Sequence, residues 1–254
     1  MKQKSLFGLL VTLLSMGAMG SSEVCIDHGK NTVTISADYY FYGNYAKSNQ
    51  VNPCASEINR MFNTGLMVQL NKRGTWKKLV VKVKPYIVTE AQAINLALNN
   101  KNTKNNFVRI DVPTKGSRVN ISEHGLRSNF GYFIVENDLG TSTTCTHEFA
   151  HGLGLQHVGE PCDWRGKGVP PIMANRGCFV DKKYQYNPKA KAGKAGGTIN
   201  PIHRQVLASE ISKIKLGDLS FQWVTPEKEC ASQGTATNVL FHKDGSRYMA
   251  ENAQ

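Results

Sequence analysis

The sequence predicts an α+β protein, in which a mixed, twisted sheet with backing helices is followed by a loop-rich segment that ends in a helix. Two observations carry this prediction. Strand-like and helix-like patterns alternate along the first part of the chain, up to a histidine-bearing helix that starts between residues 141 and 144. Regular patterns then become sparse, and prolines and glycines recur up to about residue 197. We therefore expect the histidine-bearing helix to pack against a sheet built from the first half of the chain.

The predicted strands are short stretches that are rich in β-branched and aromatic residues or that alternate apolar with polar side chains. Turn-forming residues or predicted helices separate them, as expected for a sheet with helices on it. These stretches are residues 32–42, 79–88, 107–112, 118–121 and 131–135.

Two helices are predicted before the histidines, over residues 53–62 and 89–99. Thr89 is the expected N-cap of the second helix, because a hydroxyl at that position can accept a hydrogen bond from a free backbone N–H. The side chains expected to face the core are Ile58, Met61 and Phe62 in the first helix and Ala91, Ile94 and Leu96 in the second.

A last helix is predicted from Asn200 to Ile211, with asparagine as its cap and Pro201 in its first turn. The tail from Cys230 onward is polar, and we expect it to be peripheral. The side chains of the last helix that are expected to face the core are Ile202, Val206, Leu207 and Ile211.

Three histidines cluster in the stretch His147-Glu148-Phe-Ala-His151-Gly-Leu-Gly154-Leu-Gln-His157. Histidines four positions apart lie on one face of a helix and can bind one zinc ion, while Glu148 lies beside them without being a ligand. Gly154 tolerates a left-handed backbone, so the chain can turn there and bring up a third imidazole. The pattern predicts a zinc site with ligands His147, His151 and His157 and one position open for water, as in catalytic zinc sites.

This pattern resembles that of the metzincin clan of zinc endopeptidases. Enzymes of the clan also have a "Met-turn", a tight turn with a methionine beneath the metal. The corresponding segment here is residues 169–175, which contains Met173. The resemblance implies one catalytic Zn²⁺ ion and the hydrolysis of peptide bonds in proteins.

The resemblance also implies a metzincin-like catalytic domain over residues 21–254. Its N-terminal subdomain would cover about 21–154 and its C-terminal subdomain 155–254. In such enzymes an extended substrate adds as a strand to an edge of the sheet, and the expected edge is the strand at 131–135 or the one before it.

Two positions depart from the better-known families of the clan, so no family within it is assigned. Val158 follows the third histidine, a position that often marks the family. Asn175 stands where several families have a tyrosine that contacts the metal or the transition state, and Tyr184 or Tyr186 is an alternative source of that hydroxyl.

In the expected chemistry, Glu148 is the general base that takes a proton from a zinc-activated water and passes it to the leaving amine. Two other functions stay open. One is a zinc amidase or peptidase that acts on cell-wall peptides, which the basic charge favours. The other is an adhesin or toxin module with an inert, purely structural zinc ion, although such a site has no use for a general base.

The first residues read as a secretory signal, with Lys2 and Lys4 before a short apolar core and small residues up to Gly20. We expect cleavage after Gly20, which would remove residues 1–20 and release a secreted protein, extracellular or periplasmic. An uncleaved anchor is the alternative. The apolar run is too short for a comfortable membrane span, and no transmembrane segment is predicted elsewhere.

The chain has six cysteines, an even number that favours disulfides in an exported protein. The preferred local pair is Cys162 with Cys178, because it would tie the segment after His157 to the one after Met173. Cys25 is open to two interpretations: it forms an ordinary disulfide, or its thiolate occupies the free zinc position and keeps the enzyme latent.

The formal net charge of +12 has two interpretations. It can reflect adhesion to an anionic surface or substrate, or a solvated surface with lysine-rich loops. Aromatic residues are not interleaved with the basic ones in the way that nucleic-acid readers require, so no nucleic-acid partner is predicted. Protein or peptide substrates are the expected partners.

Overall fold

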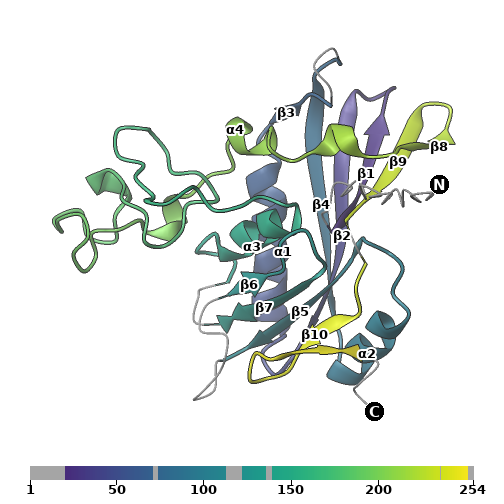
Figure 1. Cartoon of the computed structure of the whole chain (residues 1–254), viewed down its shortest axis with the longest axis horizontal. Helices are drawn as coiled ribbons and strands as arrows, with labels where there is room; N and C mark the ends of the chain where they lie inside the picture. The colour runs from purple at the N-terminus through teal and green to yellow at the C-terminus, as the bar shows by residue number, and fades with distance from the viewer. Residues whose placement is uncertain (1–20, 71–73, 113–121, 136–138, 235, 251–254) are drawn as a thin grey trace, which may run out of the picture.

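The computed structural model describes residues 21–70, 74–112, 122–135, 139–234 and 236–250, which form a mixed α+β fold (Figure 1). The predicted signal sequence and the predicted strand at 118–121 lie outside these residues. The helices are α1 (Ser48–Phe62), α2 (Glu90–Leu98), α3 (Thr144–Gly152) and α4 (Ala208–Ile211). The strands are β1 (Ser22–Asp27), β2 (Thr32–Tyr42), β3 (Met67–Val68), β4 (Lys77–Ile87), β5 (Asn105–Asp111), β6 (Glu123–His124), β7 (Phe130–Ile134), β8 (Gln222–Thr225), β9 (Lys228–Gln233), β10 (Val239–Phe241) and β11 (Arg247–Met249).

Nine of these strands form one mixed, twisted sheet with β2 at its centre. The main path through the sheet is β6-β7-β5-β2-β1-β9-β8, and β4 pairs with β2 and carries β3. Strand β2 is antiparallel to β1 and parallel to β4 and β5, and β7 continues the parallel part beside β5. The short strand β6 pairs antiparallel with β7 and forms one edge of the sheet.

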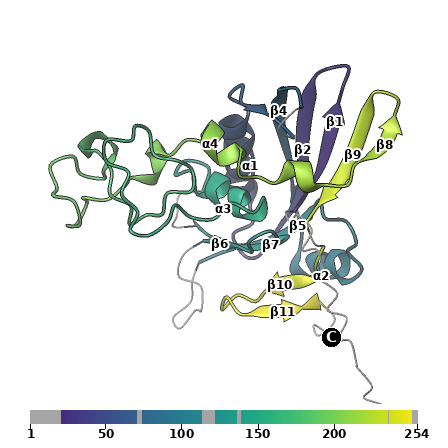
Figure 2. The ribbon, with the colours of Figure 1, turned by 45° about the horizontal axis from the view of Figure 1, so that its top comes forward.

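Alternation along β2 divides the core into two layers, because successive side chains of a strand point to opposite faces. Ile35, Tyr39 and Phe41 belong to the larger cluster, which α1 and α3 cover. Tyr42 belongs to a smaller cluster on the other face, which α2 and β10 cover. Figure 2 shows α1 and α3 on one side of the sheet and α2 with the β10–β11 hairpin on the other. The histidine-bearing helix α3 therefore packs on the sheet, as predicted.

The predicted strands inside the described residues are confirmed, and β2 has the predicted bounds. Helix α1 starts five residues before the predicted start and contains Pro53 in its interior. An internal proline costs a helix about 3 kcal/mol. The burial of Val51 and the disulfide at Cys54 hold the extra turn in place against that cost.

Helix α2 has the predicted cap: the Thr89 hydroxyl accepts from the backbone N–H of Gln92, whose side chain bonds back to the Thr89 backbone. The predicted inward face is wrong at two of three positions, because Ala91 and Leu96 are exposed. The side chains that pack inward are Ala93, Ile94, Ala97 and Leu98, which follow the i, i+3, i+4 spacing of a single helical face.

The predicted helix from Asn200 to Ile211 is wrong in its middle. Asn200 does cap a turn, but that turn is a 3₁₀ turn that ends at His203, and α4 covers only the last four residues. The segment between them is extended, since Gln205 pairs with the Pro170–Pro171 segment and donates its N–H to the Pro170 carbonyl at 2.9 Å. Of the expected core side chains, Val206 and Ile211 are buried, Leu207 is half-buried and Ile202 is exposed.

The prediction of a peripheral tail is also wrong. Strand β9 pairs with β1 over its whole length, so the chain returns to the main sheet after α4. Leu240 and Phe241 of β10 are fully buried against the second face. These residues belong to a single apolar run of three residues in an otherwise polar stretch, which is why the pattern of the tail alone did not reveal their burial. The division into subdomains near residue 154 stays a prediction.

All six cysteines are paired, in the bonds Cys25–Cys230, Cys54–Cys145 and Cys162–Cys178. The last pair confirms the predicted local bridge. The sulfur of Cys25 is bonded to Cys230 in strand β9. While that disulfide is intact, Cys25 has no thiolate that could occupy the metal site, so the latency role is excluded. Three disulfides suggest an oxidising, extracellular environment. Among the described residues, no helix has the length and apolar character needed to cross a bilayer.

Candidate metal centre

Helix α3 carries His147, Glu148 and His151, and two links to α1 hold it in position. The disulfide from Cys145 to Cys54 fixes the helix two residues before His147. The buried carboxylate of Glu57 in α1 caps its first turn. Both links come from one face of α1, because Cys54 and Glu57 are three residues apart on that helix.

Glu57 accepts three hydrogen bonds, from the backbone N–H groups of Thr143 and Thr146 and from the Thr146 hydroxyl, each at 3.0 Å. These N–H groups would otherwise have no partner inside the helix. Burial raises the pKa of Glu57, and the bonds from Thr146 and Thr143 act in the opposite direction. Sequence reasoning missed this residue. Its position on the same helical face as Cys54 and Met61 was the available signal.

The end of α3 turns as the sequence predicted. Gly154 has a φ of +94°, in the left-handed region that favours glycine. The turn is closed by hydrogen bonds from the Gly154 N–H to the His151 carbonyl at 2.8 Å and from the Leu155 N–H to the Ala150 carbonyl at 3.0 Å. It brings the Leu155 carbonyl to Nδ1 of His151 at 2.8 Å and delivers His157 to the other two histidines.

The three histidines converge through the same ring atom. Nε2 of His157 lies 3.0 Å from Nε2 of His147 and 3.1 Å from Nε2 of His151. Nδ1 of His147 lies 2.7 Å from the Ile172 carbonyl. Since a carbonyl only accepts, Nδ1 of both His147 and His151 carries the proton and Nε2 presents a lone pair.

If Nε2 of His157 carries a proton, it can donate to Nε2 of His147 or of His151, but not to both. One metal cation between the three rings can bind all three Nε2 atoms. The donor set therefore fits a metal ion, and its second sphere of backbone carbonyls is typical of metal-bound imidazoles. Burial lowers the pKa of all three rings, to about 4 for His151. The rings are neutral at neutral pH, which is the form that binds metal.

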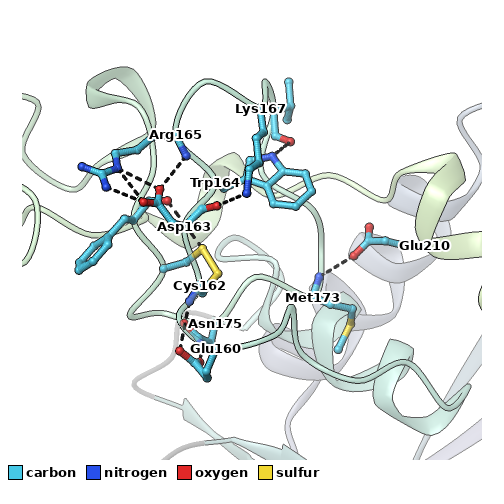
Figure 3. The surroundings of a disulfide bond; sticks show 12 residues. Glu160, Cys162, Asp163, Trp164, Arg165, Lys167, Met173, Asn175 and Glu210 are labelled. Atoms are coloured by element: carbon cyan, nitrogen blue, oxygen red, sulfur yellow. Dashed lines mark hydrogen bonds and ion pairs between the residues drawn. A yellow bond between two sulfur atoms is a disulfide. The ribbon is translucent and has the colours of Figure 1, made fainter.

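The predicted Met-turn segment contacts this cluster through the backbone carbonyl of Ile172. Met173 is buried in the main core, and the carbonyl of its neighbour Ile172 orients His147. Glu210 of α4 accepts from the N–H groups of Ile172 at 3.1 Å and Met173 at 2.9 Å, and the second of these bonds is drawn in Figure 3. Glu210 was not recognised from the sequence, although it lies among apolar residues that were expected to face the core.

The loop-rich segment around this turn is held by local bonds. The Cys162–Cys178 disulfide joins the chain on the two sides of the turn, and the side chain of Asn175 donates to Glu160 beside it (Figure 3). Neither tyrosine considered as an alternative to Asn175 lines the cleft at the histidines: Tyr184 packs on His203, and the Tyr186 hydroxyl accepts from Arg176.

The histidines and Glu148 line one cleft with a volume of about 430 Å³, in the range of small-molecule and peptide sites. Edge strand β6 borders it through Glu123 and His124. Burial raises the pKa of Glu148 well above its usual range, while the charge of Arg204 and a hydrogen bond from the His124 backbone act to lower it. Glu148 is not part of the three-histidine group, in agreement with a carboxylate that is no ligand.

Arg204 also lines this cleft, and the sequence analysis did not single it out. Its side chain is only 3% exposed. Burial lowers its pKa to about 10, so it stays a cation at neutral pH. The arginine lies in the extended segment that was predicted as helix, which explains why its position at the site could not be foreseen.

The site thus belongs to the class of three-histidine clusters that can hold a metal ion. No protein-family model and no curated protein matches this chain, so the assignment depends on these residues alone.

Replacing Gly154 by alanine should weaken the binding of a metal ion by the three histidines, with zinc as the probe, because a Cβ is strained at this φ and relaxation of the turn would move the Leu155 carbonyl from His151. We expect the affinity for zinc to fall about 10-fold, measured by competition with a chromophoric chelator. Gly168→Ala is the matched control, since Gly168 has a φ of +86° and an added Cβ meets nothing within 4 Å. Equal affinities in the two variants would contradict the role of the turn.

Proposed function

We propose that this chain is a secreted, zinc-dependent endopeptidase of the metzincin clan that hydrolyses peptide bonds in proteins. The observation that carries the proposal is the convergence of three Nε2 atoms in the same cleft as a buried carboxylate that is no ligand. A purely structural site needs the first feature only. The second feature is what water-mediated hydrolysis requires.

His147, His151 and His157 would hold the ion. When bound, zinc supplies Lewis acidity, which lowers the pKa of water to about 7 and polarises a carbonyl group. The Ile172 and Leu155 carbonyls keep the proton on Nδ1 of two rings, so that Nε2 stays available as a ligand.

Glu148 is the general base in this proposal. Its carboxylate takes the proton from the attacking water and then passes it to the nitrogen of the leaving amine, so the water adds to the carbonyl carbon while the C–N bond breaks. A hydrogen bond from the His124 backbone lowers the pKa of this carboxylate, against the effect of burial, and so favours the charged form that accepts a proton. Helix α3 fixes Glu148 next to His147, because the two residues are adjacent on one rigid element.

Edge strand β6 supports a peptide as the substrate. Its residues border the cleft, and its pairing with β7 leaves the other side of the strand at the edge of the sheet. An extended peptide can add there by backbone hydrogen bonds and so pass across the histidine cluster. The sequence predicted this edge at residues 131–135 or in the strand before them, at 118–121, which lies outside the described residues. Strand β6 was not predicted.

The test is cleavage of a denatured protein by the zinc-loaded chain, with and without a chelator. We expect His151→Ala to lose zinc and activity together, whereas His203→Ala, outside the cluster, should keep both. Zinc content is measured by mass spectrometry. Stoichiometric zinc with no cleavage of protein, but with release of peptides from peptidoglycan, would replace the endopeptidase by the cell-wall amidase.

A further inference from the structure

Arg204 is a buried cation whose guanidinium has no bonding partner among the described residues. No hydrogen bond or ion pair of its guanidinium occurs within the described part of the chain, and its Nε is among the fully buried polar atoms that lack a partner. Burying an unpaired charge is costly, so such a group is retained where a ligand completes it. Arg204 lines the cleft, so a ligand there can reach it.

A second cation, Arg176, lines the same cleft. Arg176 is half-buried, and after burial itself its positive charge also lowers the pKa of Arg204. Arg176 is oriented by the Thr144 hydroxyl at 3.2 Å and the Tyr186 hydroxyl at 3.0 Å, which are neutral groups. Two guanidinium groups are thus held close to one another with neither charge neutralised by an ion pair among the described residues.

The nearby acidic groups are committed elsewhere. Glu148 is the acid of the cleft whose charge acts on Arg204, but no ion pair joins the two among the described residues, and the proposed reaction uses its carboxylate on water. The carboxylate of Glu57 accepts hydrogen bonds from the first turn of α3. Glu123, the other acid that lines the cleft, is paired with Arg247 at 2.9 Å. Among the described residues, Arg204 and Arg176 therefore form no ion pair with an acid of the cleft.

The position of Arg204 is fixed by the backbone. Its own N–H donates to the Pro201 carbonyl at 3.0 Å, and the next residue, Gln205, is bonded to Pro170. The side chain that starts from this fixed backbone is only 3% exposed, which limits its conformations before a ligand arrives, so less conformational entropy is lost when a ligand binds. Its planar fork of donors matches a carboxylate in a bidentate manner, which a lysine could not do.

We propose that Arg204, assisted by Arg176, forms a carboxylate-binding subsite that selects peptides with an acidic residue beside the scissile bond. This inference rests on the proposed function. The shared chemistry is a carboxylate, which can come from an internal Asp or Glu side chain or from the free C-terminus of a peptide. The cleft at Arg204 adjoins the histidines, so the residue it recognises lies close to the bond that is cut.

The first experiment maps the cleavage sites in a denatured protein by mass spectrometry. We expect Asp or Glu to be enriched at one fixed position beside the cut. Arg204→Gln should lower kcat/KM for acidic sites by about 10- to 100-fold and leave neutral sites nearly unchanged. Arg165→Gln is the matched control, because Arg165 lies in the same loop-rich segment but is paired with Asp163 and does not line the cleft. An equal loss on acidic and neutral sites overturns the proposal.

Blocked peptides separate the two sources of the carboxylate. Cleavage of peptides with amidated C-termini and an internal glutamate, in preference to glutamine, supports recognition of a side chain. A requirement for a free C-terminus would overturn the side-chain assignment, and cleavage would then be confined to chain ends.

A second experiment measures binding of a carboxylate to the zinc-free chain, so that the subsite is tested without any measurement of protease activity. Glutarate should raise the midpoint of thermal unfolding of the wild type and of Arg165→Gln, whereas its neutral analogue glutaramide should not. Arg204→Gln should lose the shift, and Arg176→Gln, at a less buried position, should reduce it. A shift that is the same in all four proteins, or absent in the wild type, overturns the subsite even if the chain proves to be a protease.

Discussion

Glu148→Gln should lower turnover by about 10²- to 10⁴-fold while the chain keeps its zinc, because the amide cannot take a proton from water but fills the same space. Zinc should be retained because the carboxylate does not belong to the three-histidine group. The measurement pairs kcat on a denatured protein with the zinc content of the same sample. Loss of zinc in this variant would mean that Glu148 is a ligand, and turnover close to that of the wild type would end the proposed mechanism.

Glu123→Gln is the control for this variant. Glu123 is the second carboxylate that lines the cleft, but it is paired with Arg247 and lies on the edge strand. We expect it to change kcat little, since it is not adjacent to a histidine of the cluster. A loss of turnover as large as that of Glu148→Gln would point to a general electrostatic effect of the cleft and not to a positioned base.

Glu57→Ala should lower the free energy of unfolding by about 3 kcal/mol, because it leaves buried donors of α3 without an acceptor. Three hydrogen bonds to the Glu57 carboxylate are lost: one from the backbone N–H of Thr143, one from the backbone N–H of Thr146 and one from the Thr146 hydroxyl. The negative charge near the helix N-terminus is removed as well. Denaturant unfolding with the disulfides intact measures the loss.

Glu229→Ala is the matched control for stability. Glu229 is part of a surface pair with His28 at 2.9 Å, so its removal should cost less than about 1 kcal/mol. Glu57→Gln should lie between the two, since the amide oxygen can still accept but carries no charge. A change at Glu57→Ala as small as that of the control would show that the first turn of α3 finds other partners.

The support around the histidines comes from distant parts of the chain. Glu57 lies 89 residues before Thr146, and Glu210 lies 37 residues after Met173. Each is a single carboxylate inside an apolar stretch, so its local pattern says only that it faces inward. Which backbone groups it caps is decided by the packing of α1 on α3 and of α4 on the Met-turn segment. No spacing rule connects such residues.

The sequence by itself determined what depends on neighbours along the chain. Helical spacing puts His147 and His151 on one face, Gly154 permits the turn that brings His157 to them, and alternation defines β2. The short loop of the Cys162–Cys178 bridge also belongs here, because its ends lie near one another on either side of the turn at Met173.

Tertiary structure alone decided the rest. The pairing of Cys25 with Cys230 and the return of β9 to β1 span more than 200 residues, since the two cysteines are 205 apart. The position of Arg204 in the cleft depends on the pairing of Gln205 with Pro171, which breaks a stretch whose local pattern favours a helix. The physical reason is the same in each case: local propensities differ by fractions of a kcal/mol per residue, and burial and pairing with a distant segment outweigh them.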